Sequence, residues 1–283
     1  MGEMMQREQL ISKDITVVIP TKNEEKAIGK VIDELKALGL NNILVVDGYS
    51  TDKTAEIVKS KQVHLIYQIG KGKTGAIQTA IENVNTPYMM VIDGDYTYDP
   101  SNINELLNYI DSHAEVIGVR IPTSDKSMTR LHKFGNKVLT FVFNLLMGTK
   151  ISDICSGLYI LRTDVAKQLR FTGSGFDVEA EIAAQIASKY SIAEAPIKYR
   201  PRIGKEKLST WRHGFSILSS IIKFGLKYNP SRFYKLLSIP LTIISITLLI
   251  QDFITLLFIA STGILYIIIG MLIKTKFSNN RNK

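Results

Sequence analysis

The sequence is poor in the residues that build disulfides and zinc sites. Its 283 residues include one cysteine, Cys155, and four histidines. A single cysteine excludes an intramolecular disulfide and a metal cluster built on several cysteines, which suits a domain in the cytosol. His64, His113, His132 and His213 are scattered, with no spacing typical of zinc ligands. We therefore expect neither a disulfide-stabilised secreted domain nor a zinc enzyme.

The first 14 residues lack the apolar core of a secretory signal. The longest apolar run lies near the other end, at residues 236–273, where Gln251 and Asp252 are the only strongly polar positions. As one helix this run would be about 57 Å long at 1.5 Å per residue, whereas a bilayer core is about 30 Å thick. The run therefore predicts two membrane helices, at residues 233–250 and 253–273. A shallow hairpin is the alternative, because the first helix contains a proline.

Negative charge is scarce just before this apolar run. The formal net charge is +9, and ten Lys or Arg residues between positions 198 and 235 face one acid, Glu206. Because these cations adjoin the predicted anchor, we expect anionic lipid headgroups as their partner, and not nucleic acid. Residues 211–232 are expected to form an amphipathic interfacial helix, 233–274 a two-helix membrane anchor, and 275–283 a basic cytoplasmic tail. The positive-inside rule then places the catalytic domain and both termini on the cytoplasmic side of a cell membrane.

Residues 1–210 alternate between β-branched runs and segments with helical spacing. This alternation predicts an α/β domain with a mostly parallel sheet covered on both faces. The expected strands are 15–19, 43–46, 63–67, 88–92 and 115–119, and the expected helices are 27–38, 51–60, 73–84 and 100–112. Two very apolar helices, 138–147 and 215–226, favour core packing, and the second also fits a membrane surface. Ligands of such sheets bind beyond the carboxyl ends of the strands.

Polar loops follow four of the expected strands. Asp93 and Asp95 come directly after a buried strand, and carboxylates one residue apart can hold one hard divalent cation. Gly94 between them allows close approach of backbone and ligand. The other loops are Pro20–Glu25, Asp47–Thr54 and Gly70–Ala76. Each loop alone could be a helix cap or a tight turn, but the four in this order indicate a ligand site.

These loops, in this order, resemble those of family-two glycosyltransferases with the GT-A fold, and within them the dolichyl-phosphate mannose and glucose synthases. The resemblance covers about Ile15 to Ser209. It implies a catalytic domain of GT-A fold, a Mg²⁺ or Mn²⁺ ion held by Asp93 and Asp95, and a nucleotide-diphosphate sugar as donor. By resemblance, the donor contacts are Pro20, Thr21, Asn23, Glu24, Asp47, Lys73, Asp93, Gly94 and Asp95.

Segments further along the chain also resemble the family. Arg130, Asn136 and Gly148 frame an apolar helix, and Ile151–Leu158 resembles the acceptor-side segment. Gly175–Glu181 resembles the stretch before the next helix, and Arg200–Ser209 the loop that folds over the donor and acceptor phosphates. The resemblance implies that the lipid phosphate is bound by Arg130, Asn136, Arg200, Arg202 and Lys207, and that the catalytic residues are Asp95, Asp153, Arg130, Arg200 and Arg202. The sequence departs from the family at three positions, where Gly48 replaces a frequent acid, Thr97 a frequent glutamine and Glu206 a frequent serine.

The expected reaction is inverting transfer of glucose or mannose to dolichyl or polyprenyl phosphate at the cytoplasmic membrane face. A phosphate oxygen is already anionic near neutral pH, so it needs arginines to bind it and no general base. One alternative is a hydroxyl acceptor with Asp153 as the base. The others are a non-catalytic lipid-phosphate-binding scaffold and a P-loop nucleotidase, although Tyr67 stands where a P-loop requires glycine. The sequence leaves the nucleotide (UDP or GDP), the hexose and the oligomeric state open.

Overall fold

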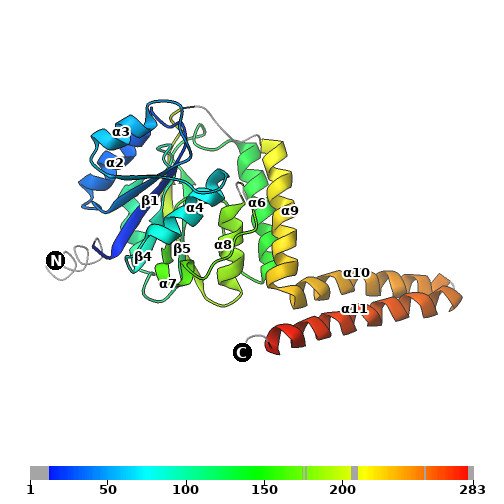
Figure 1. The fold of residues 1–283 in the computed structure, drawn as a ribbon. Helices are drawn as coiled ribbons and strands as arrows, with labels where there is room; N and C mark the ends of the chain where they lie inside the picture. The colour runs from blue at the N-terminus through cyan, green and yellow to red at the C-terminus, as the bar shows by residue number, and fades with distance from the viewer. Residues whose placement is uncertain (1–12, 174, 176, 205–209, 252, 280–283) are drawn as a thin grey trace.

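The computed structural model describes residues 13–173, 175, 177–204, 210–251 and 253–279. These residues contain a seven-stranded sheet in the order β3-β2-β1-β4-β6-β5-β7 (Figure 1). The strands are β1 (Ile15–Thr21), β2 (Ile43–Asp47), β3 (His64–Tyr67), β4 (Tyr88–Val91), β5 (Glu115–Pro122), β6 (Tyr159–Arg162) and β7 (Ile192–Tyr199). Strand β6 runs antiparallel to its neighbours β4 and β5, and the other pairs are parallel. The predicted α/β class with a mostly parallel sheet is confirmed.

Helices cover both faces of this sheet, which explains the nearly continuous apolar strands. Along β1, Val17 and Ile19 pack on one face and Val18 on the other. The first face is covered by α2 (Ile28–Ala37), α3 (Thr54–Ser60), and α5 (Ile103–Leu107) with the short 3₁₀ turn η1 (Pro100–Asn102) before it. The second is covered by α4 (Gly72–Asn83), α7 (Thr163–Ala166) and α8 (Val178–Ala187).

A third apolar cluster joins the sheet to two long helices, α6 (Arg130–Met147) and α9 (Thr210–Tyr228). The two helices stand side by side at one end of the domain (Figure 1). They cross closely at Gly225, where a Cβ atom would lie 2.9 Å from Leu146 Cβ. Helix α6 ends at Gly148, whose φ of 78° is a left-handed conformation that glycine adopts without strain.

Two further helices, α10 (Pro230–Gln251) and α11 (Phe253–Asn279), lie side by side and extend away from the domain (Figure 1). The described residues therefore include two C-terminal helices. Within the described residues, however, one stretch alone, Ile259–Phe277, is long and apolar enough to cross a membrane. The structure thus supports one candidate span where the sequence predicted two. Lys207 and residues 280–283 of the predicted basic tail lie outside the described residues.

The carboxyl ends of the central parallel strands meet at one edge of the sheet. Thr21 at the end of β1 is paired in register with Asp47 at the end of β2. Asp93 and Asp95 follow the neighbouring strand β4. The polar loops predicted from the sequence are therefore adjacent in space, as strand ends in such sheets require.

Candidate active site

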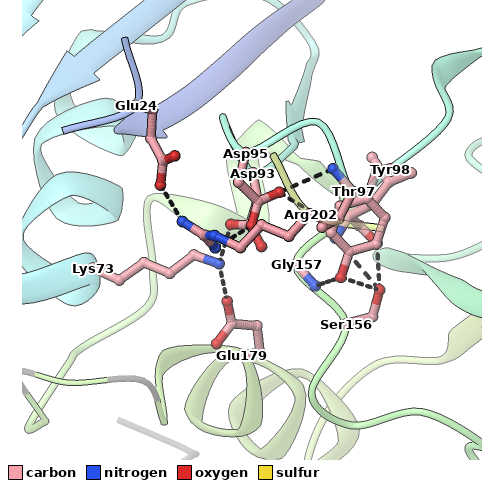
Figure 2. A network of polar contacts seen from close by, with 11 residues as sticks. Glu24, Lys73, Asp93, Asp95, Thr97, Tyr98, Ser156, Gly157, Glu179 and Arg202 are labelled. Carbon is pink, nitrogen blue, oxygen red and sulfur yellow. Dashed lines mark hydrogen bonds and ion pairs between the residues drawn. The ribbon is translucent and has the colours of Figure 1, made fainter. Parts of the chain in front are cut away.

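Asp93 is the first carboxylate beyond β4, and it is held by a lysine from another loop. Lys73 Nζ lies 2.5 Å from Asp93 Oδ1 and 2.6 Å from Glu179 Oε1 (Figure 2). Lys73 lies in the first turn of α4 and Glu179 in the first turn of α8. Burial opposes the charged ammonium, but the charges of Asp93 and Glu179 raise the pKa of Lys73 well above its usual value. The lysine is therefore a fixed cation that bridges two acids.

Asp95 is buried and has partners on both carboxylate oxygens. Its Oδ1 accepts hydrogen bonds from the backbone N–H and the hydroxyl of Thr97, at 3.0 and 2.5 Å. Its Oδ2 pairs with Arg202, whose guanidinium also pairs with Glu24 (Figure 2). Burial and the charge of Asp93 raise the pKa of Asp95, although Arg202 and Thr97 act in the opposite direction. Arg202 therefore links the segment after β7 to the ends of β1 and β4.

Gly157 provides the space in which the Asp93 carboxylate lies. A Cβ atom at this position would fall 2.2 Å from Asp93 Oδ2, well inside van der Waals contact. The backbone N–H of Gly157 donates to the buried Tyr98 hydroxyl at 2.5 Å, which fixes the glycine in turn (Figure 2). Glycine is needed here for close approach of the backbone to a carboxylate.

The loops after β1 and β2 bind each other through side-chain oxygens. Asn23 Oδ1 accepts from the Thr51 backbone N–H at 2.7 Å, and the Ser50 hydroxyl accepts from the Asn23 N–H at 2.8 Å. The fully buried Asp47 accepts from the Ser50 N–H at 3.0 Å. Beside this junction is a cavity of about 440 Å³, lined by Asn23, Glu24, Glu25, Lys26, Asp52, Ile203 and Gly204.

Thr21 and Gly94 meet inside this edge of the sheet. Thr21 is buried, and its hydroxyl has no hydrogen-bond partner among the described residues. A Cβ atom on Gly94 would lie 3.2 Å from that hydroxyl oxygen. An unpartnered buried hydroxyl is costly unless a ligand or water completes it. Pro20 precedes Thr21 within β1 and is half-buried.

A second group of charged residues surrounds Asp153. Arg120 Nε and Nη2 donate to the two Asp153 oxygens at 2.8 and 2.7 Å, and the Asn136 amide donates at 3.0 Å. The Asp153 backbone N–H donates to Glu194 at 3.2 Å. Asp153 is 3% exposed, so its carboxylate is almost fully used within the protein. The Arg120 guanidinium also lies 5.5 Å from the centre of the Tyr199 ring.

The three arginines predicted to bind the lipid phosphate have separate surroundings. Arg202 is at the Asp95 carboxylate, as described above. Arg200 pairs with Glu34 and Asp99, both at 2.8 Å, and stacks over Tyr96. Arg130 is exposed at the start of α6. The structure therefore brings Arg202 to the carboxylates after β4 and does not gather the three into one cluster.

The residues present fit a divalent metal ion that takes part of its coordination from a ligand. Asp93 and Asp95 offer hard carboxylate oxygens, and the Asp93 side chain is 29% exposed. Among the described residues no group of three or more His, Cys, Asp or Glu could hold a metal by itself. Mg²⁺ is typically bound by one or two carboxylates together with phosphates and water. A phosphate-bearing ligand would complete such a site.

The profile of one protein family, described as glycosyl transferase family 2, matches residues 16–170, more than half of the chain. The chain belongs to glycosyl transferase family 2. It is a glycosyltransferase, and the acids beyond β4 lie within the matched part.

Proteins similar in sequence to this glycosyltransferase are themselves named as sugar transferases. The dolichyl-phosphate hexose transferase of Haloferax volcanii is 32% identical over 218 residues, 76% of this chain and 95% of that protein. Glycosyltransferase AglJ of the same organism is 32% identical over 192 residues, 66% of this chain, and the chain spans 63% of its length. The UDP-N-acetylglucosamine–dolichyl-phosphate N-acetylglucosaminyltransferase of Methanococcus voltae is 30% identical over 67% of this chain and 86% of that protein.

Solved structures confirm the GT-A-like fold of the glycosyltransferase. Glucosyl-3-phosphoglycerate synthase of Mycobacterium tuberculosis, in a complex with Mn²⁺ and UDP-glucose, superposes with a TM-score of 0.61 at 18% identity, over 78% of this chain and 82% of that one. Mannosyl-3-phosphoglycerate synthase of Rubrobacter xylanophilus gives 0.60 at 16% identity, over 75% and 72%. At these identities the likeness concerns the fold.

Sequence reasoning missed two charged residues of the glycosyltransferase's site, Arg120 and Glu179. Arg120 lies in β5, which was expected to end at residue 119 but continues to Pro122. Glu179 was seen only as part of a segment before a helix, although an acid in a first helical turn beside a glycine-rich loop was a usable sign. Their partners, Asp153 and Lys73, are 33 and 106 residues away in sequence, so spacing alone could not pair them.

Proposed function

We propose that this glycosyltransferase transfers a hexose, with inversion, from a nucleotide-diphosphate sugar to a dolichyl or polyprenyl phosphate at the cytoplasmic face of a membrane. A phosphate oxygen of the lipid attacks the anomeric carbon, and the bond to the nucleoside diphosphate breaks. The names of two relatives, a dolichyl-phosphate hexose transferase and a dolichyl-phosphate N-acetylglucosaminyltransferase, support this acceptor class.

The observation that carries this proposal is the burial and hydrogen bonding of Asp153. A hydroxyl acceptor needs a general base that can take its proton. Asp153 is nearly fully buried and accepts two hydrogen bonds from the Arg120 side chain and one from Asn136. That arrangement suits a carboxylate that orients an arginine, and leaves it poorly placed to remove a proton. A phosphate acceptor requires no base, and an oriented guanidinium is well matched to phosphate oxygens.

On the donor side, the loops after β1 and β2 and the cavity beside Glu24 support binding of the nucleotide. Asp93 and Asp95 would hold Mg²⁺ or Mn²⁺, which supplies charge to stabilise the leaving diphosphate. Lys73 and Arg202 already contact these two acids and can donate to phosphate oxygens beside them. Arg202 and Lys73 are therefore assigned to the diphosphate, and Arg120 replaces Arg130 and Arg200 as the main candidate for the acceptor phosphate.

An exposed apolar face supports a lipid acceptor. Helix α6 buries one side against the domain and exposes large apolar residues on the other at spacings of three and four: Leu131, Phe134, Val138, Phe141 and Leu145. Helix α9 exposes Phe215, Ile222 and Leu226 beside the cations Lys223 and Lys227. Both helices stand crosswise to α10 and α11 at the end of the domain from which that pair emerges (Figure 1). Contiguous exposed apolar residues with flanking cations are typical of a membrane-lying surface.

The proposal is tested by comparing polyprenyl phosphate with polyprenol as the acceptor. Purified protein in detergent should transfer sugar from one of UDP-glucose, GDP-mannose or UDP-N-acetylglucosamine to polyprenyl phosphate, and ignore polyprenol with the same chain. The rate should level off above about pH 7, since the second pKa of a phosphate monoester is near 6. Excess chelator should abolish transfer. Equal use of polyprenol would overturn the phosphate acceptor and restore Asp153 as a general base.

A further inference from the structure

Lys73 forms ion pairs with two carboxylates, although a single carboxylate would be enough to neutralise its charge. Its ammonium contacts both Asp93 and Glu179 (Figure 2). The Lys73 side chain is 14% exposed and that of Glu179 is 10% exposed, so this ion pair is largely shielded from solvent. Lys73 also sits in the first turn of the 12-residue helix α4, where the helix dipole disfavours a cation. The local structure therefore opposes a positive charge at this position, and the two acids offset that cost.

The two acids have different surroundings, which suggests different roles. Asp93 is open to solvent on one side, and its carboxylate would bind the metal ion. Glu179 belongs to α8 and faces away from solvent. Asp93 would share its oxygens between Lys73 and a bound divalent ion, and the like charges of ion and ammonium would repel each other. An ammonium left without a carboxylate in a half-buried site would be strongly unfavourable.

We infer that Glu179 is a positioning residue that retains Lys73 beside the metal site, so that the freed ammonium is directed to the diphosphate of the donor. This inference rests on the proposed function, because it assigns the diphosphate as the ligand of Lys73. Glu179 itself touches neither donor nor acceptor. Its own negative charge repels a diphosphate, so a direct electrostatic contribution of Glu179 to donor binding would be unfavourable.

Repulsion of the diphosphate by Glu179 and positioning of Lys73 by Glu179 have opposite effects on nucleotide binding. A double-mutant cycle can separate the two. Binding of UDP, and of GDP in parallel, is measured by calorimetry on the full chain in detergent with saturating Mn²⁺. We expect Glu179→Gln to weaken nucleotide binding about fivefold to tenfold, although it removes a negative charge. In a Lys73→Met background the same change should leave binding equal or slightly tighter. Glu179→Asp, which keeps the charge on a shorter side chain, should lie between native and Glu179→Gln.

The outcomes separate three explanations. Equal weakening in both backgrounds would mean that Glu179 only supports the fold of α8, and tightening in both would mean plain charge repulsion; either result overturns the inference. If Glu179→Gln fails to fold, shown by thermal unfolding, Glu179→Asp carries the same comparison. Native protein that binds neither nucleotide with Mn²⁺ would overturn the proposed function itself.

Discussion

At the scale of single residues, three acids of the candidate site are paired with cations from distant segments. Asp93 has Lys73, Asp95 has Arg202 and Asp153 has Arg120. Removing one partner of such a pair leaves an uncompensated buried charge, which is more costly than the pair is favourable. Substitutions at the site should therefore keep the charges and alter their positions. Glycines that contact these acids offer that possibility.

Gly157→Ala should displace Asp93 without changing any charge. The new methyl group would lie 2.2 Å from Asp93 Oδ2, and neighbouring Oδ1 binds Lys73, so the carboxylate must move. A shift of about 1 Å in a catalytic group can cost a hundredfold in rate, and we expect a loss of about that size in initial rate with the preferred nucleotide sugar. Gly135→Ala is the matched control, since its methyl group would meet nothing within 4 Å. Native turnover by Gly157→Ala would contradict the placement of Asp93.

Glu115→Gln should change how stability depends on pH. Burial, with the charges of Glu179 and Glu194, raises the pKa of Glu115 from 4.5 to about 8. The folded protein therefore keeps the proton that the unfolded chain loses, and this contribution to stability is lost as pH rises from about 4.5 through 8. Glutamine is neutral at every pH, so the variant should gain a few kcal/mol over native protein at pH 8.5, given about 1.4 kcal/mol per pKa unit. The gain should fall to below about 1 kcal/mol at pH 5, half a unit above the unfolded pKa. Melting temperatures at the two pH values measure it, and a difference that does not depend on pH would show that Glu115 is ionised when folded.

At the scale of elements, the sequence was sufficient where structure is local. Strands β1, β2 and β4 and the polar loops after them follow from short apolar runs ended by Pro, Asp and Gly, and they lie where expected. Strands β6 and β7 were not foreseen, because a four-residue strand such as Tyr159–Arg162 is defined by its partners β4 and β5. The expected helix 100–112 is shorter, a 3₁₀ turn and α5 ending at Leu107.

The site was predictable to the same extent and for the same reason. Asp93, Asp95, Glu24 and Asp47 follow strands directly, so the topology of a parallel sheet brings them together. Arg120 depends on how far β5 extends, which is set by its pairing with β7 as far as Pro122 and Tyr199. The surroundings of Arg200 depend on α2, whose Glu34 is 166 residues away. Contacts over such distances are determined by tertiary packing, which local patterns do not reveal.

The contact between α6 and α9 gives a prediction at this scale. Gly225→Ala would place a methyl group 2.9 Å from Leu146 Cβ and force the helices apart, at a cost of about 1–3 kcal/mol typical of overpacking. Gly214→Ala in the same helix meets nothing within 4 Å and should be neutral or stabilising, because alanine favours helix by about 1 kcal/mol. The melting temperatures of the two variants should therefore shift in opposite directions. Equal shifts would mean that α9 does not pack on α6 at this point.

At the scale of the whole molecule, hydrogen bonds connect the C-terminal helices to α6, and α6 to Asp153. The start of α10 is bound to the end of α6: Arg232 Nε donates to the Leu145 carbonyl at 2.7 Å, and the Asn229 amide donates to the Met147 carbonyl at 3.0 Å. Asn136, on the same α6, contacts Asp153. The helix pair is thus connected to the group of charged residues around Asp153 through α6.

The disposition of α10 and α11 in the membrane is the last property that can be predicted and tested. Basic residues flank the apolar region on both sides, Arg232 and Lys235 before it and Lys274 and Lys276 after it, which favours both flanks in the cytosol. Single cysteines at Gln251 and Ser278, in a Cys155→Ala background, would be treated with an impermeant maleimide in intact and permeabilised cells. We expect Gln251→Cys to be labelled in intact cells and Ser278→Cys only after permeabilisation.

A third cysteine, at Lys235, separates two crossings from one. If α11 alone crosses in the same orientation, the labelling of Gln251→Cys and Ser278→Cys is the same as for two crossings. Two crossings place the third cysteine in the cytosol beside Ser278, whereas labelling of Lys235→Cys from outside would mean that α10 does not cross. Labelling of both Lys235→Cys and Ser278→Cys in intact cells would reverse the orientation, place the domain outside and remove a cytosolic nucleotide sugar from reach of the site.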